Sequence, residues 1–196
     1  MMRRRLLLAG LGGALVATGG IVVFRLVSSP PKQQSDRRDF ELADVNGAKT
    51  TLATFRGKWA LLFFGYTNCP DICPTTLLNV ANTLDAMGEE AKRFQPVFIT
   101  IDPERDTAPV LKEYLANFGG HFVGLTGTPA QIAVAASAYQ TFYRKVPVEG
   151  GYMMEHSSGL ALISPNGTYV RTFRPDDAPA DFAKELLAAV KEDSAQ

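Results

Sequence analysis

Residues 59–74 read WALLFFGYTNCPDICP, and this stretch indicates the fold. Trp59–Gly65 is a continuous apolar run of strand length, which is typical of a central strand buried on both faces of a sheet. The loop that follows carries both cysteines of the chain, Cys69 and Cys73, and Pro74 suits the first turn of a helix. The sequence therefore predicts a buried strand, a cysteine-bearing loop and a helix in immediate succession.

The rest of the chain predicts alternating strands and helices with a hairpin near each end. Asn46-Gly47 is a strong hairpin signal between 40–43 and 50–52, and Pro165-Asn166-Gly167 marks another turn. This order is typical of an α/β, thioredoxin-like sandwich, in which helices flank a central mixed sheet and residues 104–140 form the crossover between its halves. The expected strands are 97–101, 122–125, 159–163 and 169–173, the expected helices are 74–87, 109–118, 129–138 and 181–190, and residues 139–146 form an extended arm.

Composition excludes several classes of protein. With 196 residues, 46% hydrophobic and 20% charged, the chain is neither disordered nor a fibrous rod. Four of its 20 basic residues lie within residues 1–27, which hold no acidic residue, so the remainder is net acidic. A net acidic domain lacks the basic stripe of a nucleic-acid binder.

The N-terminus predicts a membrane anchor. Arg3-Arg4-Arg5 precedes Leu6–Phe24, an uncharged run of 19 residues. As a helix this run would span about 28 Å, close to the roughly 30 Å hydrocarbon core of a bilayer, and the arginines would stay on the cytoplasmic side. Residues 1–27 are therefore expected to be an uncleaved anchor, 28–39 a flexible tether and 40–193 the folded domain. A signal peptide cleaved near Ala17-Thr18-Gly19 is the alternative.

The two cysteines are candidates for soft-metal binding or redox chemistry. They are spaced C-x3-C at the start of a helix, where the partial positive charge favours thiolates. Two cysteines are too few for a Cys₄ zinc site, and an inert pair or a static disulfide is the structural alternative. Peroxidase chemistry is disfavoured because Tyr66 stands where a threonine would be expected.

A metal site with two thiolates needs a further donor, and the chain has two histidines. His121 precedes a strand that should run parallel to Trp59–Gly65, which places it at the opposite edge of the sheet. His156 precedes strand 159–163, which should run antiparallel, so its entry loop returns to the cysteine edge. Topology therefore favours His156 as the third ligand.

Three further residues could contribute to the site. Asp102 follows strand 97–101 at the same edge and could orient a metal ligand or bias its proton without touching the metal, or it could simply shape the turn before Pro103. Met153 and Met154 are soft donors in principle, although packing is the simpler role for methionine.

Four segments together resemble the Sco/SenC family over about residues 40–190. The segments are GYTNCPDICP at 65–74, TIDPERDT at 100–107, VGLTG at 123–127 and EHS at 155–157. Members of this family are membrane-anchored, thioredoxin-fold copper proteins. Two features depart from the family pattern: Glu155 stands where Asp often precedes the histidine, and the pair Met153-Met154 is unusual.

The resemblance implies a function and a location. It implies that Cys69, Cys73 and His156 bind Cu(I), Cu(II) or both, and that the chain is a chaperone rather than an enzyme. The expected partner is subunit II of cytochrome c oxidase, whose CuA centre would receive the metal during assembly. Another periplasmic copper chaperone or a thiol reductase is a further expected partner. The expected location is the periplasmic face of a bacterial inner membrane. The alternative function is a thiol-disulfide reductase in which Cys69 and Cys73 keep the CuA-site cysteines reduced.

Overall fold

The computed structural model describes residues 38–174 and 177–195. The expected anchor, and the expected tether as far as residue 37, lie outside the described residues. The chain divides into two compact units, residues 1–33 and 34–196, and the fold described below is that of the second. Within the described ranges, no helix has the length and apolar character needed to cross a bilayer.

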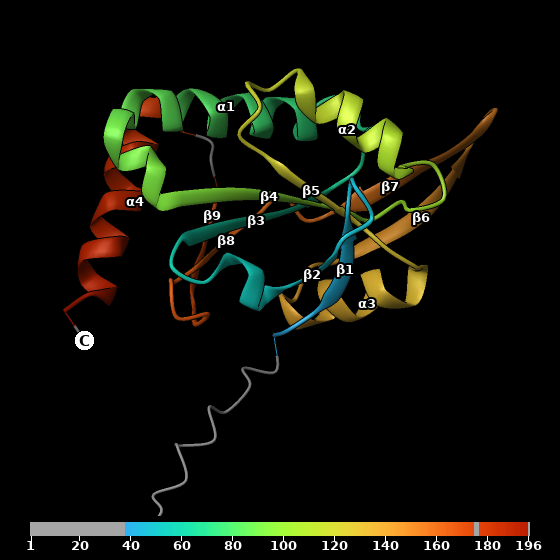
Figure 1. The fold of residues 1–196 in the computed structure, drawn as a ribbon. Coiled ribbons are helices and arrows are strands. Elements are labelled where there is room, and N and C mark those ends of the chain that lie inside the picture. Colours follow the sequence, from blue (N-terminus) through green and yellow to red (C-terminus); the bar gives the residue numbers. More distant parts are fainter. Residues whose placement is uncertain (1–37, 175–176, 196) are drawn as a thin grey trace, which may run out of the picture. The chain divides into compact units, whose positions relative to one another are not determined.

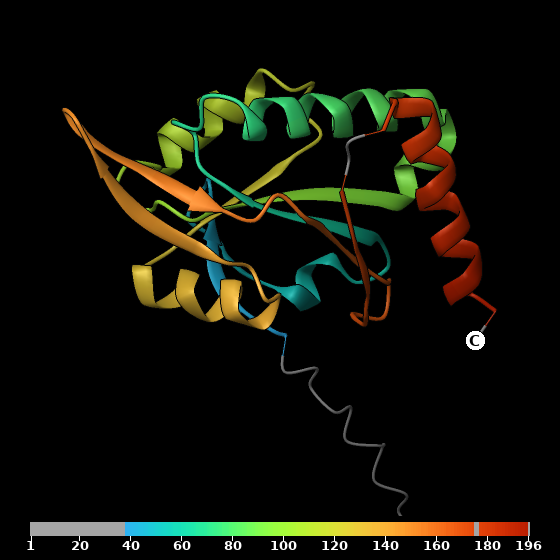
Figure 2. The same cartoon turned by 180° about the vertical axis from the view of Figure 1, so that it is seen from behind.

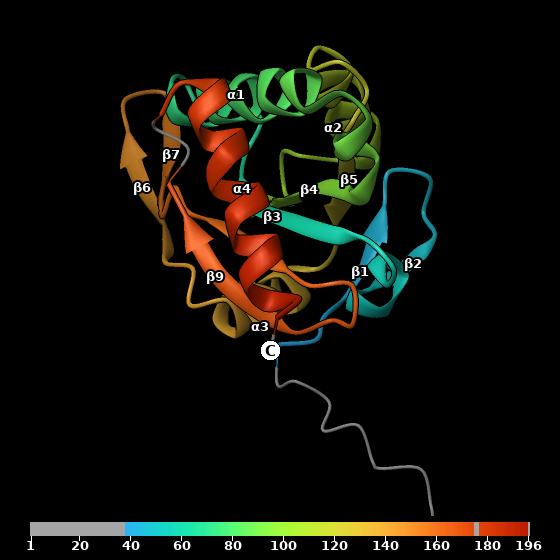
Figure 3. The same ribbon diagram turned by 90° about the vertical axis from the view of Figure 1, so that its left-hand side faces the viewer.

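A seven-stranded sheet in the order β2-β1-β5-β4-β3-β8-β9 forms the centre of this unit (Figure 1). At its middle, β3 pairs parallel with β4 and antiparallel with β8, and β4 pairs parallel with β5. Figure 3 shows the β1–β2 hairpin and β9 on opposite sides of the sheet. The strands are β1 (Glu41–Asp44), β2 (Lys49–Thr51), β3 (Trp59–Gly65), β4 (Phe94–Thr100), β5 (Val123–Thr126), β8 (Leu160–Ile163) and β9 (Tyr169–Phe173).

Helices cover both faces of the sheet, as Figure 2 shows from behind. On one face α1 (Ile72–Met87) packs against α4 (Pro179–Asp193), and α2 (Ala108–Ala116) packs against β5. On the other face α3 (Pro129–Ala138) packs against β1. Short 3₁₀ helices, η1 (Leu52–Phe55) and η2 (Gly88–Arg93), connect strands and helices. The arrangement confirms the expected sandwich, with α2, β5 and α3 in the crossover.

Burial of the central strands follows from their sequences. All seven residues of β3 are buried, as expected of an apolar strand with helices on both faces. Both predicted hairpins are confirmed, since Leu42 pairs with Thr50 and Leu162 pairs with Arg171 across antiparallel strands.

A second, two-stranded sheet corrects one expectation. β6 (Tyr143–Val148) and β7 (Gly151–His156) form an antiparallel hairpin that projects from the domain (Figures 1 and 2). Residues 139–146 were expected to be an extended arm and His156 to lie in a loop; instead His156 is the last residue of β7, paired with Tyr143. Gly150, with φ of +79°, makes the tight turn that allows this pairing.

Candidate metal centre

Two thiols and an imidazole converge at the carboxyl end of β3. Cys69 lies in the loop after β3, Cys73 in the first turn of α1, and His156 at the end of β7. The Nε2 atom of His156 lies 3.4 Å from Sγ of Cys73 and 4.0 Å from Sγ of Cys69. All three ligand atoms lie within 4.8 Å of one another, and both cysteines are free thiols. Three segments that are distant in the sequence thus meet at one point.

Glycine at position 65 makes room for Cys73. A Cβ atom built on Gly65 would lie 2.7 Å from Sγ of Cys73, 2.9 Å from the ring of Phe98 and 3.0 Å from the ring of Phe63. Real Cβ atoms do not approach neighbours this closely, so the fully buried Cys73 thiol rests directly on the backbone at the end of β3. Here the missing side chain, rather than backbone flexibility, is the function of the glycine.

A buried carboxylate fixes the start of the cysteine loop. Asp106 accepts hydrogen bonds from the backbone N–H of Thr67 at 3.0 Å, from Oγ1 of Thr67 at 2.6 Å and from Oγ1 of Thr100 at 2.6 Å. Burial raises the pKa of Asp106 despite these three donors. Because Thr67 is two residues before Cys69, this carboxylate ties the loop to the end of β4.

The ring of His156 is held with its Nε2 toward the sulfurs. Its Nδ1 lies 2.7 Å from the carbonyl oxygen of Ser157. A carbonyl only accepts, so this hydrogen bond places the proton on Nδ1 and leaves the lone pair on Nε2. Tyr66 and Phe63 meet the ring edge-on, with centroids at 5.7 Å and 6.2 Å. This tautomer and orientation are those of a metal-ligating histidine.

The two thiols differ strongly in acidity. A hydrogen bond from the Cys73 thiol, together with hydrogen bonds from the backbone N–H groups of Asp71 and Cys73, lowers the pKa of Cys69 to about 3. Donating this hydrogen bond to Cys69 raises the pKa of Cys73, and burial of the Cys73 thiol raises it further. Without metal, therefore, Cys69 is the thiolate and Cys73 carries the proton that it donates to Cys69.

Asp102 is at the expected edge, but its side chain contacts Arg105 and the β6–β7 hairpin rather than His156. It accepts from Nε of Arg105 at 2.5 Å and from the hydroxyl of Tyr152 at 2.9 Å, and it is almost completely buried. Arg105 also donates to the carbonyl oxygen of Tyr152 at 3.0 Å, and its guanidinium stacks on the Tyr152 ring at 3.7 Å. Among the hydrogen bonds of the described residues, none joins Asp102 to His156. Asp102 and Arg105 instead clamp β7 four residues before His156.

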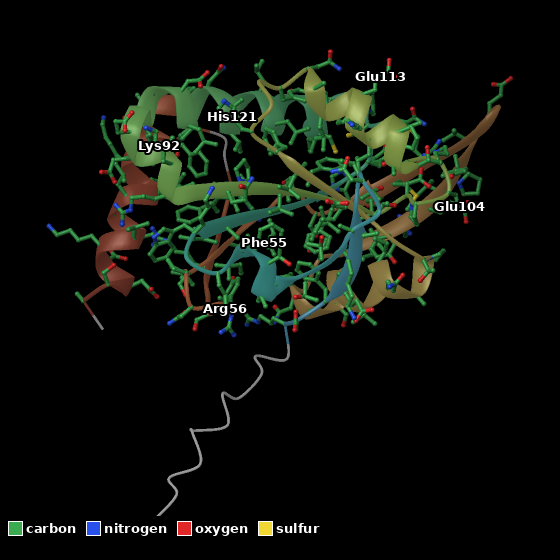
Figure 4. The ribbon with its side chains drawn as sticks, in the orientation of Figure 1. Phe55, Arg56, Lys92, Glu104, Glu113 and His121 are labelled. Carbon is green, nitrogen blue, oxygen red and sulfur yellow. The ribbon has the colours of Figure 1, made fainter. Side chains whose placement is uncertain are left out.

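The remaining candidates are separated by the fold. The Nε2 atom of His121 lies 3.4 Å from Oδ1 of Asp85, and Figure 4 labels His121 well apart from Glu104. Glu104 pairs with Lys145 of the hairpin that carries His156. The carbonyl oxygen of His121 instead accepts a hydrogen bond from Gln95 near the start of β4, so His121 is at the far edge, as expected. Met154 is buried in the core, whereas Met153 is exposed on the opposite face of β7.

Sequence reasoning missed the clamp formed by Asp102, Arg105 and Tyr152. The segment 100–107 carries Asp102 and Arg105, but its sequence gives no sign that they contact Tyr152, about 50 residues later. Tyr152 directly precedes the pair Met153-Met154, and no local pattern links its hydroxyl to a buried carboxylate.

The donor set suits a small, soft ion. Sulfur and nitrogen ligands of one metal in trigonal geometry would lie about 3.7 Å apart at typical bond lengths of roughly 2.3 Å to sulfur and 2.0 Å to nitrogen. The observed separations of 3.4 Å and 4.0 Å bracket that value. Two thiolates with one imidazole select soft and borderline metals, and an all-oxygen ligand set for calcium or magnesium is absent from this cluster.

Comparisons with known proteins identify relatives that match most of the chain. A Rickettsia prowazekii SCO2-like protein is 36% identical over 191 residues, covering 90% of this chain and 91% of its own. The human mitochondrial SCO2 homolog is 35% identical, with coverage of 97% and 77%. Bradyrhizobium japonicum ScoI, solved with copper bound, has a TM-score of 0.72 and 40% identity, covering 77% of this chain and 97% of its own.

A more distant solved structure has the same fold. Yeast Sco1, solved with copper bound, has a TM-score of 0.72 and 32% identity, covering 78% of this chain and 87% of its own. The solved ScoI chain is a folded protein that aligns over 97% of its length with 77% of this chain, so the fragment 34–196, which is of similar size, is suited to measurements on its own. The SCO1/SenC family model matches residues 28–191, and the chain belongs to the SCO1/SenC family.

Proposed function

We propose that this chain is a copper chaperone that binds one copper ion through Cys69, Cys73 and His156. The observation that carries the proposal is the convergence of two thiol sulfurs on the unprotonated Nε2 of a fixed imidazole. Relatives that were solved with copper bound support the choice of metal. Two thiolates suit Cu(I), and the imidazole adds the nitrogen donor that Cu(II) prefers.

The difference in burial between the ligands suits metal transfer. Cys73 is fully buried, whereas Cys69 and His156 are half-buried. An incoming thiolate can therefore approach the metal from the side of Cys69 and His156 and replace these ligands in turn, while Cys73 is the last to release the ion. The copper ion is cargo in this account, and the reaction is ligand exchange rather than substrate turnover.

We propose the CuA centre in subunit II of cytochrome c oxidase as the acceptor. The family resemblance supports this acceptor, and the net acidic charge outside residues 1–27 gives no basis for a nucleic-acid partner. The uncharged run Leu6–Phe24 and the arginines before it support an N-terminal anchor that holds the domain at the periplasmic face of a bacterial inner membrane.

The low pKa of Cys69 favours a second candidate function, reduction of a disulfide in the acceptor. The Cys69 thiolate would attack one sulfur of the target disulfide and release the other as a thiolate, which takes up a proton. Cys73, after losing its proton, would attack the mixed disulfide, so that the target leaves with two thiols and the chain keeps a Cys69–Cys73 disulfide. The oxidised pair could not hold copper, so the two functions use different redox states of one site.

His156 separates the two functions. Replacing His156 with Ala leaves both thiolates, so Cu(I) binding should weaken but survive, Cu(II) binding should be lost, and thiol-disulfide exchange should change little. His121→Ala is the matched control, since His121 lies at the far edge of the sheet. In cells that lack the native protein, His156→Ala should fail to restore copper loading of the oxidase. Full restoration by His156→Ala, but not by Cys69→Ser, would refute the chaperone and support the reductase.

A further inference from the structure

A polar pocket opens beside the imidazole of His156. It has a volume of about 610 Å³ and lies between the end of α3, the β7–β8 connection and β9. Its described lining contains two arginines and no aspartate or glutamate. The residues that matter most here are Arg38, Gln140, Ser158, Tyr169, Thr172 and Arg174.

The pocket is a local exception in an acidic domain. Outside residues 1–27 the chain carries 16 basic and 20 acidic residues, yet this lining holds positive charges alone. Another pocket, beside His121 at the far edge, mixes Lys58 and Lys92 with Asp85. A smaller pocket under the hairpin mixes Lys145 with Asp102 and Glu104. Among these three pockets, the one at His156 is alone in having described lining residues with charges of one sign.

The arginines are placed to receive an anion. The guanidinium of Arg38 stacks on the Tyr169 ring, 3.8 Å from its centroid, and the Tyr169 hydroxyl contacts Oγ1 of Thr172 at 3.0 Å. Stacking uses the face of the guanidinium and leaves its N–H edge for hydrogen bonds. No ion pair between described residues involves Arg38 or Arg174. Two guanidinium groups suit carboxylates, which they can bind in bidentate fashion.

We propose that this pocket docks an acidic segment of the protein that receives the copper, and thereby brings the acceptor's ligands to the metal. This inference rests on the proposed function and adds where the acceptor binds. His156 lines the pocket and also faces the two sulfurs, so a segment seated there lies beside the metal centre. Opposite charge at such a place speeds encounter and fixes the orientation of the partner.

The first test measures docking alone, on the reduced, metal-free fragment 34–196 labelled with ¹⁵N. Titration with a hexaglutamate peptide at low salt should shift amide signals around Gln140, Ser158 and Thr172 in a saturable way. The double variant Arg38→Gln, Arg174→Gln should bind at least about tenfold more weakly. Arg56→Gln is the matched control, since Arg56 is an exposed arginine just before β3, and it should bind like the wild type.

The second test measures copper transfer from the Cu(I)-loaded fragment to the metal-free soluble domain of oxidase subunit II. The double variant should load copper normally but transfer it about tenfold more slowly at low salt, and added salt should slow the wild type more than the variant. The docking proposal would be overturned if the double variant transferred copper as fast as the wild type, or if hexaglutamate caused no saturable shifts. It would also be overturned if inorganic phosphate bound the pocket as tightly as hexaglutamate does. A fragment that retains no copper would instead overturn the proposed function, and the peptide titration would still decide the docking.

Discussion

Replacing Gly65 with Ala tests whether the site depends on the close contact between the backbone and Cys73. The new Cβ would lie 2.7 Å from Sγ of Cys73, about 0.8 Å short of an ordinary contact near 3.5 Å. The rings of Phe98 and Phe63 would lie 2.9 Å and 3.0 Å from the same Cβ, so the new methyl group cannot turn away from the sulfur. Because Cys73 is fully buried, its sulfur must then move by several tenths of an ångström. Metal sites tolerate only about 0.2 Å in ligand distance.

The expected loss follows from that displacement. Cu(I) affinity should fall about 10- to 100-fold, the usual effect of disturbing the groups that position a metal ligand. The free energy of unfolding should fall by about 1–3 kcal/mol, as for other overpacked cores. Competition with a Cu(I) chelator measures the first quantity, and urea unfolding of the metal-free, reduced fragment 34–196 measures the second.

Gly151→Ala is the matched control for this variant. Gly151 is also a strand glycine, it has an ordinary backbone conformation, and a Cβ built on it meets nothing within 4 Å. It should therefore bind copper and unfold like the wild type. A folded Gly65→Ala variant with wild-type copper affinity would refute the reasoning, because Cys73 would then not need its place against the backbone of β3.

Two further predictions concern the clamp and the reactive thiol. Arg105→Gln should lower the free energy of unfolding by about 3 kcal/mol, because it leaves the buried Asp102 carboxylate without its cationic partner and with the Tyr152 hydroxyl as its remaining clamp contact. The variant should also weaken Cu(II) binding more than Cu(I) binding, and equal losses for both ions would contradict a role in positioning His156. Its control is Arg144→Gln on the same hairpin, whose exposed ion pair with Glu155 should contribute less than about 1 kcal/mol. Because the pKa of Cys69 is lowered to about 3, that residue is a thiolate throughout the range above it, so iodoacetamide should modify one cysteine of the reduced, metal-free protein at a rate that stays nearly constant from pH 8 down to about pH 5. Mass spectrometry after partial labelling should locate the label on Cys69, and a rate that falls tenfold per pH unit over this range would show an ordinary thiol.

Much of the fold could be predicted because its central elements carry strong local signals. Trp59–Gly65 is apolar throughout and is buried throughout, and Asn46-Gly47 closes the hairpin that it predicts. The strand β7 was missed because Gly151–His156 has neither a continuous apolar run nor strict alternation. Its partner β6 and the turn at Gly150 stabilise it, and the contacts with Arg105 hold it to the domain.

The prediction of the site depended on topology more than on motif spacing. The direction of the strand after His156 placed this histidine at the cysteine edge, and the structure brings its Nε2 to both sulfurs. The same reasoning placed Asp102 at the correct edge but could not give its partners, because hydrogen bonds to Arg105 and Tyr152 depend on how the hairpin folds back. The pocket beside His156 could not be predicted from the sequence either, because its lining residues Arg38, Gln140 and Arg174 come from segments that are distant in the chain.

X-ray absorption spectroscopy of the fragment 34–196, reduced and loaded with one equivalent of Cu(I), tests the central claim most directly. We expect one copper per chain with two sulfur ligands and one nitrogen ligand, and His156→Ala should remove the nitrogen while both sulfurs remain. A copper site with fewer than two sulfur ligands, or a spectrum unchanged in His156→Ala, would contradict that claim.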